Sequence, residues 1–383
     1  MKIVLVIDTY NGGNGGCIAT QRLAEGLKTR GHTVSIVATG TGGENFYSVK
    51  GAYLPFVKES QEKMEFLFGL PEKTVFEKAF ADADIVQIQF SFYLGYGAAK
   101  TAMAMNKPII GAFHVQPYNI VSGLGKESKL LESVLFAFFK FFLFKRVPVI
   151  QCPSQFAADL LKNSGINCHL EVVSNGIPTD YIPKQYPRPE WFGDNLVLMS
   201  VGRHAFEKRH LLMIEGVKRS RYADKIKLLL CGRGEMTEQL ITKGKELPVQ
   251  PTIQYVTHEE KLHYLNTADL FLHASVVELE SLACLEAIGC GLPCLIADSP
   301  HSAAPQFSLD HRFSFKHDNA DNLADKINYW YENRGQLLSI REQIKTMSEQ
   351  YRFEKCLDKM EALYRKAIDI TFDRKTSPHL NQQ

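Results

Sequence analysis

Three segments of the sequence combine residue types that bind anions or sugar hydroxyl groups. The first, Val201-Gly-Arg-His-Ala-Phe-Glu-Lys208, carries Arg203 and Lys208 at a spacing that lets both side chains converge on one anion. An arginine forms a bidentate fork to a phosphate and a lysine contributes a point charge, so together they could stabilise a departing diphosphate. The alternative interpretation is a solvated charged loop.

The second segment carries two carboxylates a little over two helical turns apart. It runs Glu278-Leu-Glu-Ser-Leu-Ala-Cys-Leu-Glu286 and ends before a Gly-Leu-Pro turn. A helix that begins near Ser281 and Leu282 would present its first amides to phosphate oxygens, and Glu286 would accept from sugar or ribose hydroxyls. Carboxylates in so apolar a stretch are costly to bury without partners. The segment therefore predicts a site for phosphate and sugar groups.

The third segment is a glycine-rich loop, Asn11-Gly-Gly-Asn-Gly-Gly16, between a predicted strand and a helix that begins near Ile18. Glycines there let backbone amides approach a phosphate while the helix presents its positive end. A tight turn is the alternative. A dinucleotide site is the weaker hypothesis, because the spacing is not Gly-x-Gly-x-x-Gly and the second strand ends in Ala38-Thr39-Gly40 rather than in an acid.

The elements that must position these segments are short apolar runs that alternate with helical patterns. This alternation indicates parallel sheets built from β-α-β units, in which ligands bind where the strands end. In the first half the predicted strands are 3–7, 33–38, 85–89, 108–113 and 147–151. In the second half they are 196–201, 226–231, 253–255, 270–274 and 293–297.

The length of 383 residues exceeds what one core usually supports and favours two domains. We predict two Rossmann-like, doubly wound domains that face a cleft, with proline and glycine marking the linker. The predicted parts are domain 1–182, linker 183–195, domain 196–350, a helix 351–370 that crosses back to the first domain, and a polar tail 371–383.

Charge and cysteine usage exclude several classes of protein. The 44 lysines and arginines nearly balance 42 acidic residues, which argues against a nucleic-acid partner. Eight scattered cysteines without Cys-x-x-Cys spacing indicate buried thiols rather than a zinc site or a disulfide framework. We expect no metal and no cofactor in the site.

The beginning of the chain predicts a strand rather than a signal peptide, because the apolar run after Met1 is short and soon polar. No run reaches the roughly 18 to 20 apolar residues that a spanning helix needs. We therefore expect a cytoplasmic protein, peripheral at most on the inner face of the plasma membrane.

Residues 126–146 predict an amphipathic helix with a narrow polar stripe and a basic end. Such a helix could lie in an anionic membrane interface and admit a lipid. A buried core helix is the alternative interpretation. The predicted acceptor or membrane contacts are Lys126, Lys129, Phe138, Phe139, Lys140, Lys145 and Arg146.

The order of these motifs resembles glycosyltransferase family 4, the retaining enzymes of the GT-B fold, over nearly the whole chain. The resemblance implies that Glu278 contacts the donor sugar and that Glu286 contacts the ribose. It also implies that Arg203 and Lys208 neutralise the donor diphosphate. The predicted donor-binding residues are Gly15, Gly16, Gly202, Arg203, Lys208, Glu278, Ser281, Leu282 and Glu286.

His114, in Phe113-His-Val-Gln-Pro117, matches a family position near the reactive carbon of the sugar; a structural histidine at a strand end is the alternative. The chain departs from the family at Ser281, where many members have glycine, and at Glu280, where an apolar residue is common. The variants Phe113-His-Val-Gln-Pro117 and Glu278-Leu-Glu-Ser-Leu-Ala-Cys-Leu-Glu286, with Asp298-Ser-Pro-His-Ser302 downstream, are similar to the branch of bacterial diacylglycerol glucosyltransferases.

The resemblance implies a retaining hexosyltransferase that moves glucose from UDP-glucose to a membrane lipid such as diacylglycerol. Retention would follow from front-face attack without a metal, with catalytic roles for His114, Arg203, Lys208 and Glu278. A glycan acceptor in surface polysaccharide or lipopolysaccharide assembly is the main alternative. A non-catalytic nucleotide-sugar-binding protein and a sugar-nucleotide epimerase remain open.

Overall fold

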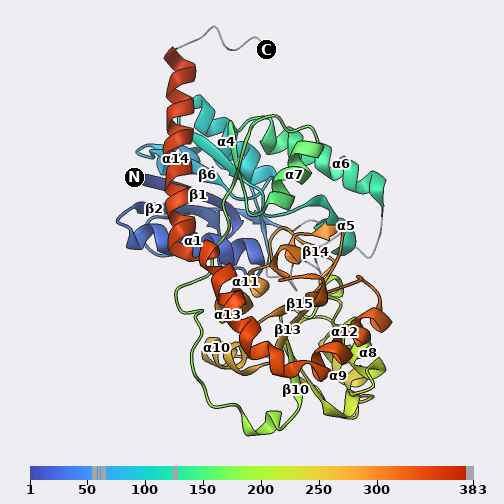
Figure 1. Cartoon of the computed structure of the whole chain (residues 1–383). Coiled ribbons are helices and arrows are strands. Elements are labelled where there is room, and N and C mark those ends of the chain that lie inside the picture. Colours follow the sequence, from blue (N-terminus) through green and yellow to red (C-terminus); the bar gives the residue numbers. More distant parts are fainter. Residues whose placement is uncertain (54–57, 59–60, 62–65, 124–127, 377–383) are drawn as a thin grey trace. The chain divides into compact units, whose positions relative to one another are not determined.

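The computed structural model describes residues 1–53, 58, 61, 66–123 and 128–376 (Figure 1). The chain divides into two compact units. Unit 1 consists of Met1–Asn175 and Glu354–Gln383, and unit 2 consists of Gly176–Phe353. Each unit is an α/β structure with its own sheet.

Unit 1 contains a seven-stranded parallel sheet in the order β3-β2-β1-β6-β7-β8-β9. The strand order reverses between β1 and β6, and side chains that follow these two strands meet at the same edge. The strands are β1 (Lys2–Thr9), β2 (Thr33–Thr39), β3 (Phe46–Val49), β6 (Ile85–Ile88), β7 (Ile109–Ala112), β8 (Val149–Cys152) and β9 (His169–Val172). Two short strands, β4 (Gly51–Ala52) and β5 (Phe68–Gly69), pair antiparallel beside the sheet.

Among the described residues, the helices of unit 1 other than the last, α14, lie in the connections between its strands. They are α1 (Gly15–Thr29), α3 (Lys73–Phe80), α4 (Tyr93–Ala104), α5 (Pro117–Gly123), α6 (Lys129–Phe139), α7 (Gln155–Asn163) and α14 (Phe353–Thr376). A π-helical turn, η1 (Lys140–Phe144), continues α6.

The last helix, α14, completes unit 1 from the far end of the sequence and is the long red helix in Figure 1. Arg30 at the end of α1 forms ion pairs with Glu354, Asp358 and Glu361 of α14. Further along, the Tyr364 hydroxyl donates to the Gln87 side chain inside the sheet. Helix α14 is thus anchored both at the rim and in the interior of unit 1.

Unit 2 contains a six-stranded parallel sheet in the order β12-β11-β10-β13-β15-β17, which reverses between β10 and β13. The strands are β10 (Leu196–Val201), β11 (Ile226–Cys231), β12 (Thr252–Gln254), β13 (Leu270–His273), β15 (Cys294–Ala297) and β17 (Ser314–Phe315). A separate parallel pair joins β14 (Val277–Glu278) to β16 (His301–Ser302). The α-helices are α8 (His210–Arg219), α9 (Thr237–Gly244), α10 (His258–Thr267), α11 (Leu282–Gly289), α12 (Ala320–Glu332) and α13 (Leu337–Ser348).

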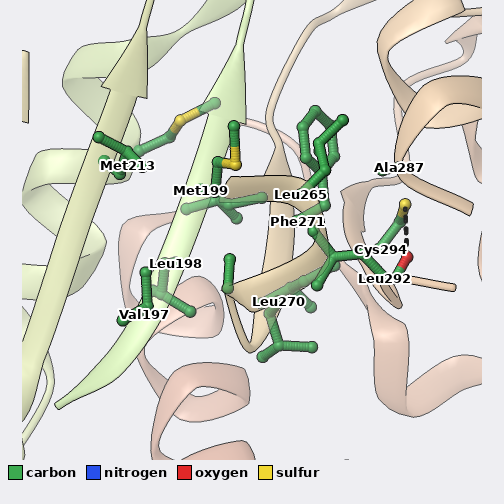
Figure 2. Close-up of a cluster of buried hydrophobic side chains, with 14 of the residues drawn as sticks. Val197, Leu198, Met199, Met213, Leu265, Leu270, Phe271, Ala287, Leu292 and Cys294 are labelled. Atoms are coloured by element: carbon green, nitrogen blue, oxygen red, sulfur yellow. Dashed lines mark hydrogen bonds between the residues drawn. The ribbon is translucent and has the colours of Figure 1, made fainter. Parts of the chain in front are cut away.

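The core of unit 2 explains why its strands read as continuous apolar runs. Helices cover both faces of a doubly wound sheet, so most positions of its central strands are buried. Met199, Leu270 and Phe271 lie in this core together with Cys294, whose thiol donates to the carbonyl of Leu292 at 3.7 Å (Figure 2). The resulting rigid sheet carries the loops that hold the polar side chains.

The predicted fold of two parallel α/β domains is confirmed by these sheets, although some element bounds differ. Residues 183–195, predicted as a linker, are grouped with unit 2, because Phe192 is fully buried in its core and Arg188 pairs with Asp269. The helix predicted over 351–370 begins at Phe353 and continues to Thr376, into the segment predicted as a tail. The prolines and glycines of residues 183–195 interrupt regular secondary structure, but the segment still packs against unit 2.

Candidate functional site

The basic loop of unit 2 follows β10 at the reversal of the sheet. It contains the short helix η3 (Phe206–Lys208), and Arg209 then takes a left-handed conformation with φ of 54°. The guanidinium of Arg203 is partly exposed and donates to Glu207 at 2.8 Å. Lys208 points elsewhere and pairs with Glu278. The two predicted diphosphate ligands therefore lie on one loop, each held by an acidic partner.

A second glycine loop, after β11, supports the basic loop. A Cβ on Gly232 would overlap the carbonyl oxygen of Gly202, and one on Gly234 would lie 2.5 Å from that of His204. The amide of His204 also donates to the carbonyl of Arg233 at 3.0 Å. Only glycine permits this approach. The sequence analysis missed this loop, for which Gly232-Arg-Gly234 directly after an apolar strand could have been the signal.

Glu278 is the most highly connected of the predicted site residues. Its Oε1 lies 2.5 Å from Nζ of Lys208 and 3.4 Å from Nε2 of His273. Burial alone would raise the pKa of Glu278, but the charges of Lys208 and His273 outweigh it and lower the pKa to about 2. Glu278 is thus a carboxylate at any ordinary pH.

Ser281 begins helix α11 as predicted, and it does so in an unusual conformation. Its φ of 89° lies in the region that favours glycine, which explains why glycine is common there in the family that the sequence resembles. The hydroxyl compensates in part, because it accepts from the amide of Cys284 at 3.3 Å. Leu282 is the first residue of the helix.

Glu286 lies further along α11 and has a different partner. Its carboxylate accepts from Lys261 of α10 at 3.0 Å, and both side chains are largely buried. The ammonium of Lys261 also lies 5.1 Å from the ring centre of Tyr181. The sequence analysis missed Lys261, since a lysine on a polar helix carries no signal of its partner.

His273 is the second site residue that the sequence analysis missed, because it ends an apolar strand. It is buried at the end of β13, with Nε2 3.4 Å from the Ser281 hydroxyl as well as from Glu278. Burial alone would lower the pKa of His273, but the negative charges of Cys284 and Glu278 raise it to about 9. The neighbouring thiol of Cys284 has a lowered pKa, because Cys294 and His273 outweigh its burial.

The glycine loop of unit 1 starts α1, whose N-cap is Asn14. The Asn14 side chain accepts from the amide of Cys17 at 3.0 Å. A Cβ on Gly16 would lie 2.7 Å from the ring of Phe90, whereas Gly15 has no atom within 4 Å of that position. Packing therefore explains Gly16, whereas nothing packs against the position that a Cβ of Gly15 would take.

His114 lies after β7 in the same unit and is held by Gln89. Its Nε2 is 3.0 Å from the side-chain oxygen of Gln89, which can only accept, so Nε2 carries the proton. Burial lowers the pKa of His114 to about 4, so the ring is neutral at pH 7. Asp8, at the end of β1, accepts from the amide of Gly69 at 3.0 Å, and burial raises its pKa to about 7.

The amphipathic segment forms α6 and η1, and most of its side chains are not buried. Leu130, Val134, Phe138 and Phe141 are 77%, 57%, 43% and 55% exposed, and with Tyr93 of α4 they form what we name the apolar surface. This stripe has the spacing of one helical face. The interpretation as a buried core helix is therefore wrong for this face of α6.

The basic residues predicted to contact a membrane differ in their surroundings. Lys129 and Lys145 are exposed, whereas Lys140 donates to the carbonyl of Ser164 at 3.3 Å. The guanidinium of Arg146 lies over the rings of Tyr96 and Phe141. Lys126 lies outside the described residues.

Phe139 was wrongly predicted as an acceptor or membrane contact. It is 1% exposed and packs against Phe92, with ring centres 5.8 Å apart. The reason is its place on the inner face of α6, next to the exposed Phe138. Two consecutive phenylalanines on a helix necessarily point in different directions.

Asp82-Ala-Asp84 has the spacing of a carboxylate metal motif, but it lies before β6, at the opposite edge of the sheet from the strand ends that carry the site. Its two carboxylates contact Lys2. Among the described residues, no three or more histidine, cysteine or acidic side chains are arranged to hold a metal ion. The expectation of a site without metal stays a prediction.

Within the described residues, no helix is long and apolar enough to cross a membrane.

Comparison with known proteins identifies the class. The family described as "Glycosyltransferase Family 4" matches residues 13–181, and that described as "Glycosyl transferases group 1" matches residues 182–349. The chain therefore belongs to the glycosyltransferases that join these two domains. The resemblance noted from the motifs is confirmed.

The chain is similar to one curated protein in sequence and to two solved structures in fold. The alpha-monoglucosyldiacylglycerol synthase of Streptococcus pneumoniae is 25% identical over 324 residues, which cover 79% of this chain and 72% of that protein. The structure of HepE from Anabaena in complex with UDP is 12% identical, with a TM-score of 0.75 over 96% of this chain and 100% of its own. Sucrose-phosphate synthase from Thermosynechococcus elongatus is 14% identical, with a TM-score of 0.75 over 97% and 100%. The fold is GT-B.

Proposed function

We propose that this glycosyltransferase moves glucose from UDP-glucose to a membrane lipid, diacylglycerol or a close relative, with retention of anomeric configuration. It acts on the inner face of the plasma membrane as a peripheral protein. The observation that carries the lipid acceptor is the apolar surface of unit 1. Unit 2 supplies the chemistry for the donor.

The donor is held by charge in unit 2. Arg203 and Lys208 neutralise the diphosphate, and the first amides of α11 at Ser281 and Leu282 add the positive end of a helix. Glu278 accepts from hydroxyls of the sugar, and Glu286 accepts from those of the ribose. Each carboxylate already has a lysine partner, Lys208 for Glu278 and Lys261 for Glu286.

Transfer follows a front-face mechanism that needs no protein nucleophile. The bond between the anomeric carbon and the diphosphate oxygen breaks, and the acceptor oxygen forms its bond on the same face. The proton of the acceptor hydroxyl passes to the departing phosphate oxygen. Lys208 and Arg203 stabilise the charge on the leaving group, and this is their largest contribution to the rate.

His114 acts as a neutral group in this scheme. A neutral imidazole beside the sugar offers a lone pair at Nδ1, since Nε2 donates to Gln89. It therefore stabilises positive charge on the sugar as a dipole, without the repulsion that an imidazolium would bring. Gly15 and Gly16 serve the donor through the start of α1.

The lipid acceptor is supported by the apolar surface together with Lys129, Lys145 and Arg146. Large apolar side chains at such exposure are costly in water and favourable in the headgroup region of a bilayer. The basic residues add attraction to anionic lipids, about 1 kcal/mol for each near the surface. The name of the streptococcal relative, a glucosyldiacylglycerol synthase, agrees with this acceptor.

The experiment that tests the proposal is an assay of donors against acceptors. Purified protein is incubated with UDP-glucose, other UDP-sugars or GDP-sugars and with vesicles that contain or lack diacylglycerol and anionic lipid. Nucleotide release and lipid products are measured, the latter by mass spectrometry, and the anomeric configuration of the product is read by NMR. We expect an α-glucosyl lipid that depends on diacylglycerol.

Variants of the apolar surface separate the lipid from other acceptors. Phe138→Ser with Phe141→Ser should lower binding to anionic vesicles by roughly tenfold or more, because two exposed aromatic side chains are lost. Leu338→Ser, at a leucine of unit 2 that is 78% exposed, is the control. Turnover that ignores lipid would move the acceptor to a glycan, and an absence of turnover with every donor would leave a binding protein.

A further inference from the structure

We propose that His273 is a positioning residue of the donor site, which takes over as the counter-cation of Glu278 when Lys208 moves to the donor diphosphate. This inference rests on the proposed function of unit 2 as the donor site. It concerns a residue that ends the apolar strand β13 and that none of the predicted motifs contains.

The argument begins with the pairing of Lys208 and Glu278. The two side chains meet at 2.5 Å, so the cation predicted to bind the diphosphate is already engaged by the carboxylate predicted to bind the sugar. When a diphosphate binds Lys208, that contact must weaken or be shared. Glu278 is only 15% exposed, and a carboxylate so little exposed is costly to leave without a counter-charge.

His273 is a second cation within reach of Glu278. Its Nε2 lies 3.4 Å from the same oxygen, Oε1, that Lys208 holds, and 3.4 Å from the Ser281 hydroxyl. The side chain is 5% exposed, and it comes from a central strand of the sheet, so its position is fixed by the core. Once Lys208 turns toward a diphosphate, His273 is left as the cation beside the Glu278 carboxylate.

The protonation state of His273 suits this role. Four titratable groups face it from the elements around it: Glu278 of β14, Lys208, Cys284 of α11 and His210 of α8. Cys294 of β15 lies behind Cys284 and interacts with it. Burial alone would lower the pKa of His273, but its interactions with Cys284 and Glu278 raise that pKa to about 9. Because the raised pKa reports a stabilised imidazolium, the contribution is present at pH 7 and is lost as pH rises through about 9.

The test is the affinity for UDP alone, measured by calorimetry, in a double-mutant cycle. His273→Leu removes the counter-cation and should weaken UDP binding by roughly tenfold, because the UDP-bound state would bury an unpaired carboxylate. His273→Gln keeps an N–H at a similar place and should recover most of the loss at pH 7. The exposed His311→Gln in the same unit is the control and should bind UDP as the natural protein does.

The second arm of the cycle repeats His273→Leu in a Glu278→Gln background. With no carboxylate to compensate, His273→Leu should then change UDP affinity by less than about twofold, so the two substitutions are not additive. An equal loss in both backgrounds, or no loss in either, would overturn the proposal. In turnover, His273→Gln should also lack the fall in rate that we expect of the natural protein as pH rises through about 9.

A titration without nucleotide separates this proposal from the proposed function. In protein labelled at histidine with ¹⁵N, the signals missing from His273→Gln identify the ring, and they should report an imidazolium at pH 7 whose pKa falls in Glu278→Gln. A neutral ring at pH 7 would reject the inference even if UDP binds. A protein that binds no nucleoside diphosphate would refute the donor site, whatever the ring reports.

Discussion

The polar groups of unit 2 meet in pairs of opposite charge, whereas those at the strand ends of unit 1 are buried and close to neutral. Lys208 pairs with Glu278 and Lys261 pairs with Glu286, so each of these two carboxylates has its own cation. In unit 1, burial lowers the pKa of His114 to about 4 and raises that of Asp8 to about 7. The same architecture thus carries two different electrostatic environments.

Under the proposed function, this difference corresponds to a division of roles between donor binding in unit 2 and acceptor binding in unit 1. A diphosphate brings charge that must be neutralised, and unit 2 has cations to exchange for it. The proposed acceptor alcohol is neutral, and unit 1 offers a neutral His114, an Asp8 whose pKa is raised to about 7, and an exposed apolar surface. The predictions below test this contrast, beginning with the largest effect.

The strongest expected effect is that of Lys208→Ala on turnover. Removing this cation should lower kcat/KM by roughly a thousandfold, because the leaving diphosphate loses its main counter-charge and Glu278 loses its nearest partner. The measurement is nucleotide release in the vesicle assay. Lys218→Ala, which breaks an exposed pair with Glu246, is the control and should stay within about twofold. Retention of more than about a tenth of the activity by Lys208→Ala would contradict the assignment.

Glu278→Gln should separate binding from chemistry. Turnover should fall by roughly a hundredfold, since an amide stabilises a positively charged sugar less well than a carboxylate does. The affinity for UDP should be unchanged or higher, because Lys208 no longer has to leave an ion pair. Calorimetry with UDP and the turnover assay together decide the point. A parallel loss of both quantities would show that Glu278 orders the site rather than acting on the sugar.

In unit 1 the corresponding test is Asp8→Asn, read as stability against pH. The folded pKa of about 7 exceeds the ordinary 3.8, so between these values the folded state holds a proton that the unfolded state releases. The free energy of unfolding therefore falls as pH rises through this window. An asparagine at this position needs no proton, so the variant should be more stable at pH 8, by on the order of 3 kcal/mol, and nearly equal at pH 4.

Denaturant unfolding at both pH values measures that effect. Asp82→Asn, at an exposed carboxylate of the same unit, is the control and should show little pH-dependent change. An equal stability difference for Asp8→Asn at pH 4 and pH 8 would mean that the Asp8 carboxyl does not titrate in the folded protein.

The smallest effect concerns two adjacent glycines. Gly16→Ala should destabilise unit 1 by about 1 to 3 kcal/mol, because its Cβ would lie 2.7 Å from Phe90 and would press toward His114. Gly15→Ala meets nothing within 4 Å and should leave stability nearly unchanged. Thermal unfolding of the two variants gives the comparison. Similar melting temperatures for the two variants would show that packing against Phe90 is not what requires glycine at position 16.

The parts of the site that the sequence analysis found are those whose chemistry is local. Arg203, Lys208 and the start of α11 follow directly from strands, so their spacing in the sequence is nearly their spacing in the loop. The prediction of a helix start near Ser281 is confirmed, and the structure adds the positive φ that the serine must adopt. The local sequence was therefore sufficient to predict these motifs and their positions after the strands.

The residues that it missed take their roles from distant partners. His273 and Asp8 end apolar strands, and Lys261 lies on a polar helix, so each looks ordinary within its own segment. The error at Phe139 has a related cause. An amphipathic pattern defines a face, but which of two adjacent phenylalanines is buried depends on Phe92, a residue from another helix terminus. Tertiary contacts decide such cases.

The anchoring of α14 has a consequence for the order in which the protein is assembled. In unit 1, Arg30 and Gln87 are synthesised early, but their partners Glu354 and Tyr364 are synthesised late. Unit 2 is one continuous stretch of chain between the two parts of unit 1. During synthesis, unit 2 can fold as soon as it leaves the ribosome, but unit 1 must wait for its last helix. The half of the protein that carries the apolar surface is therefore the last to become complete.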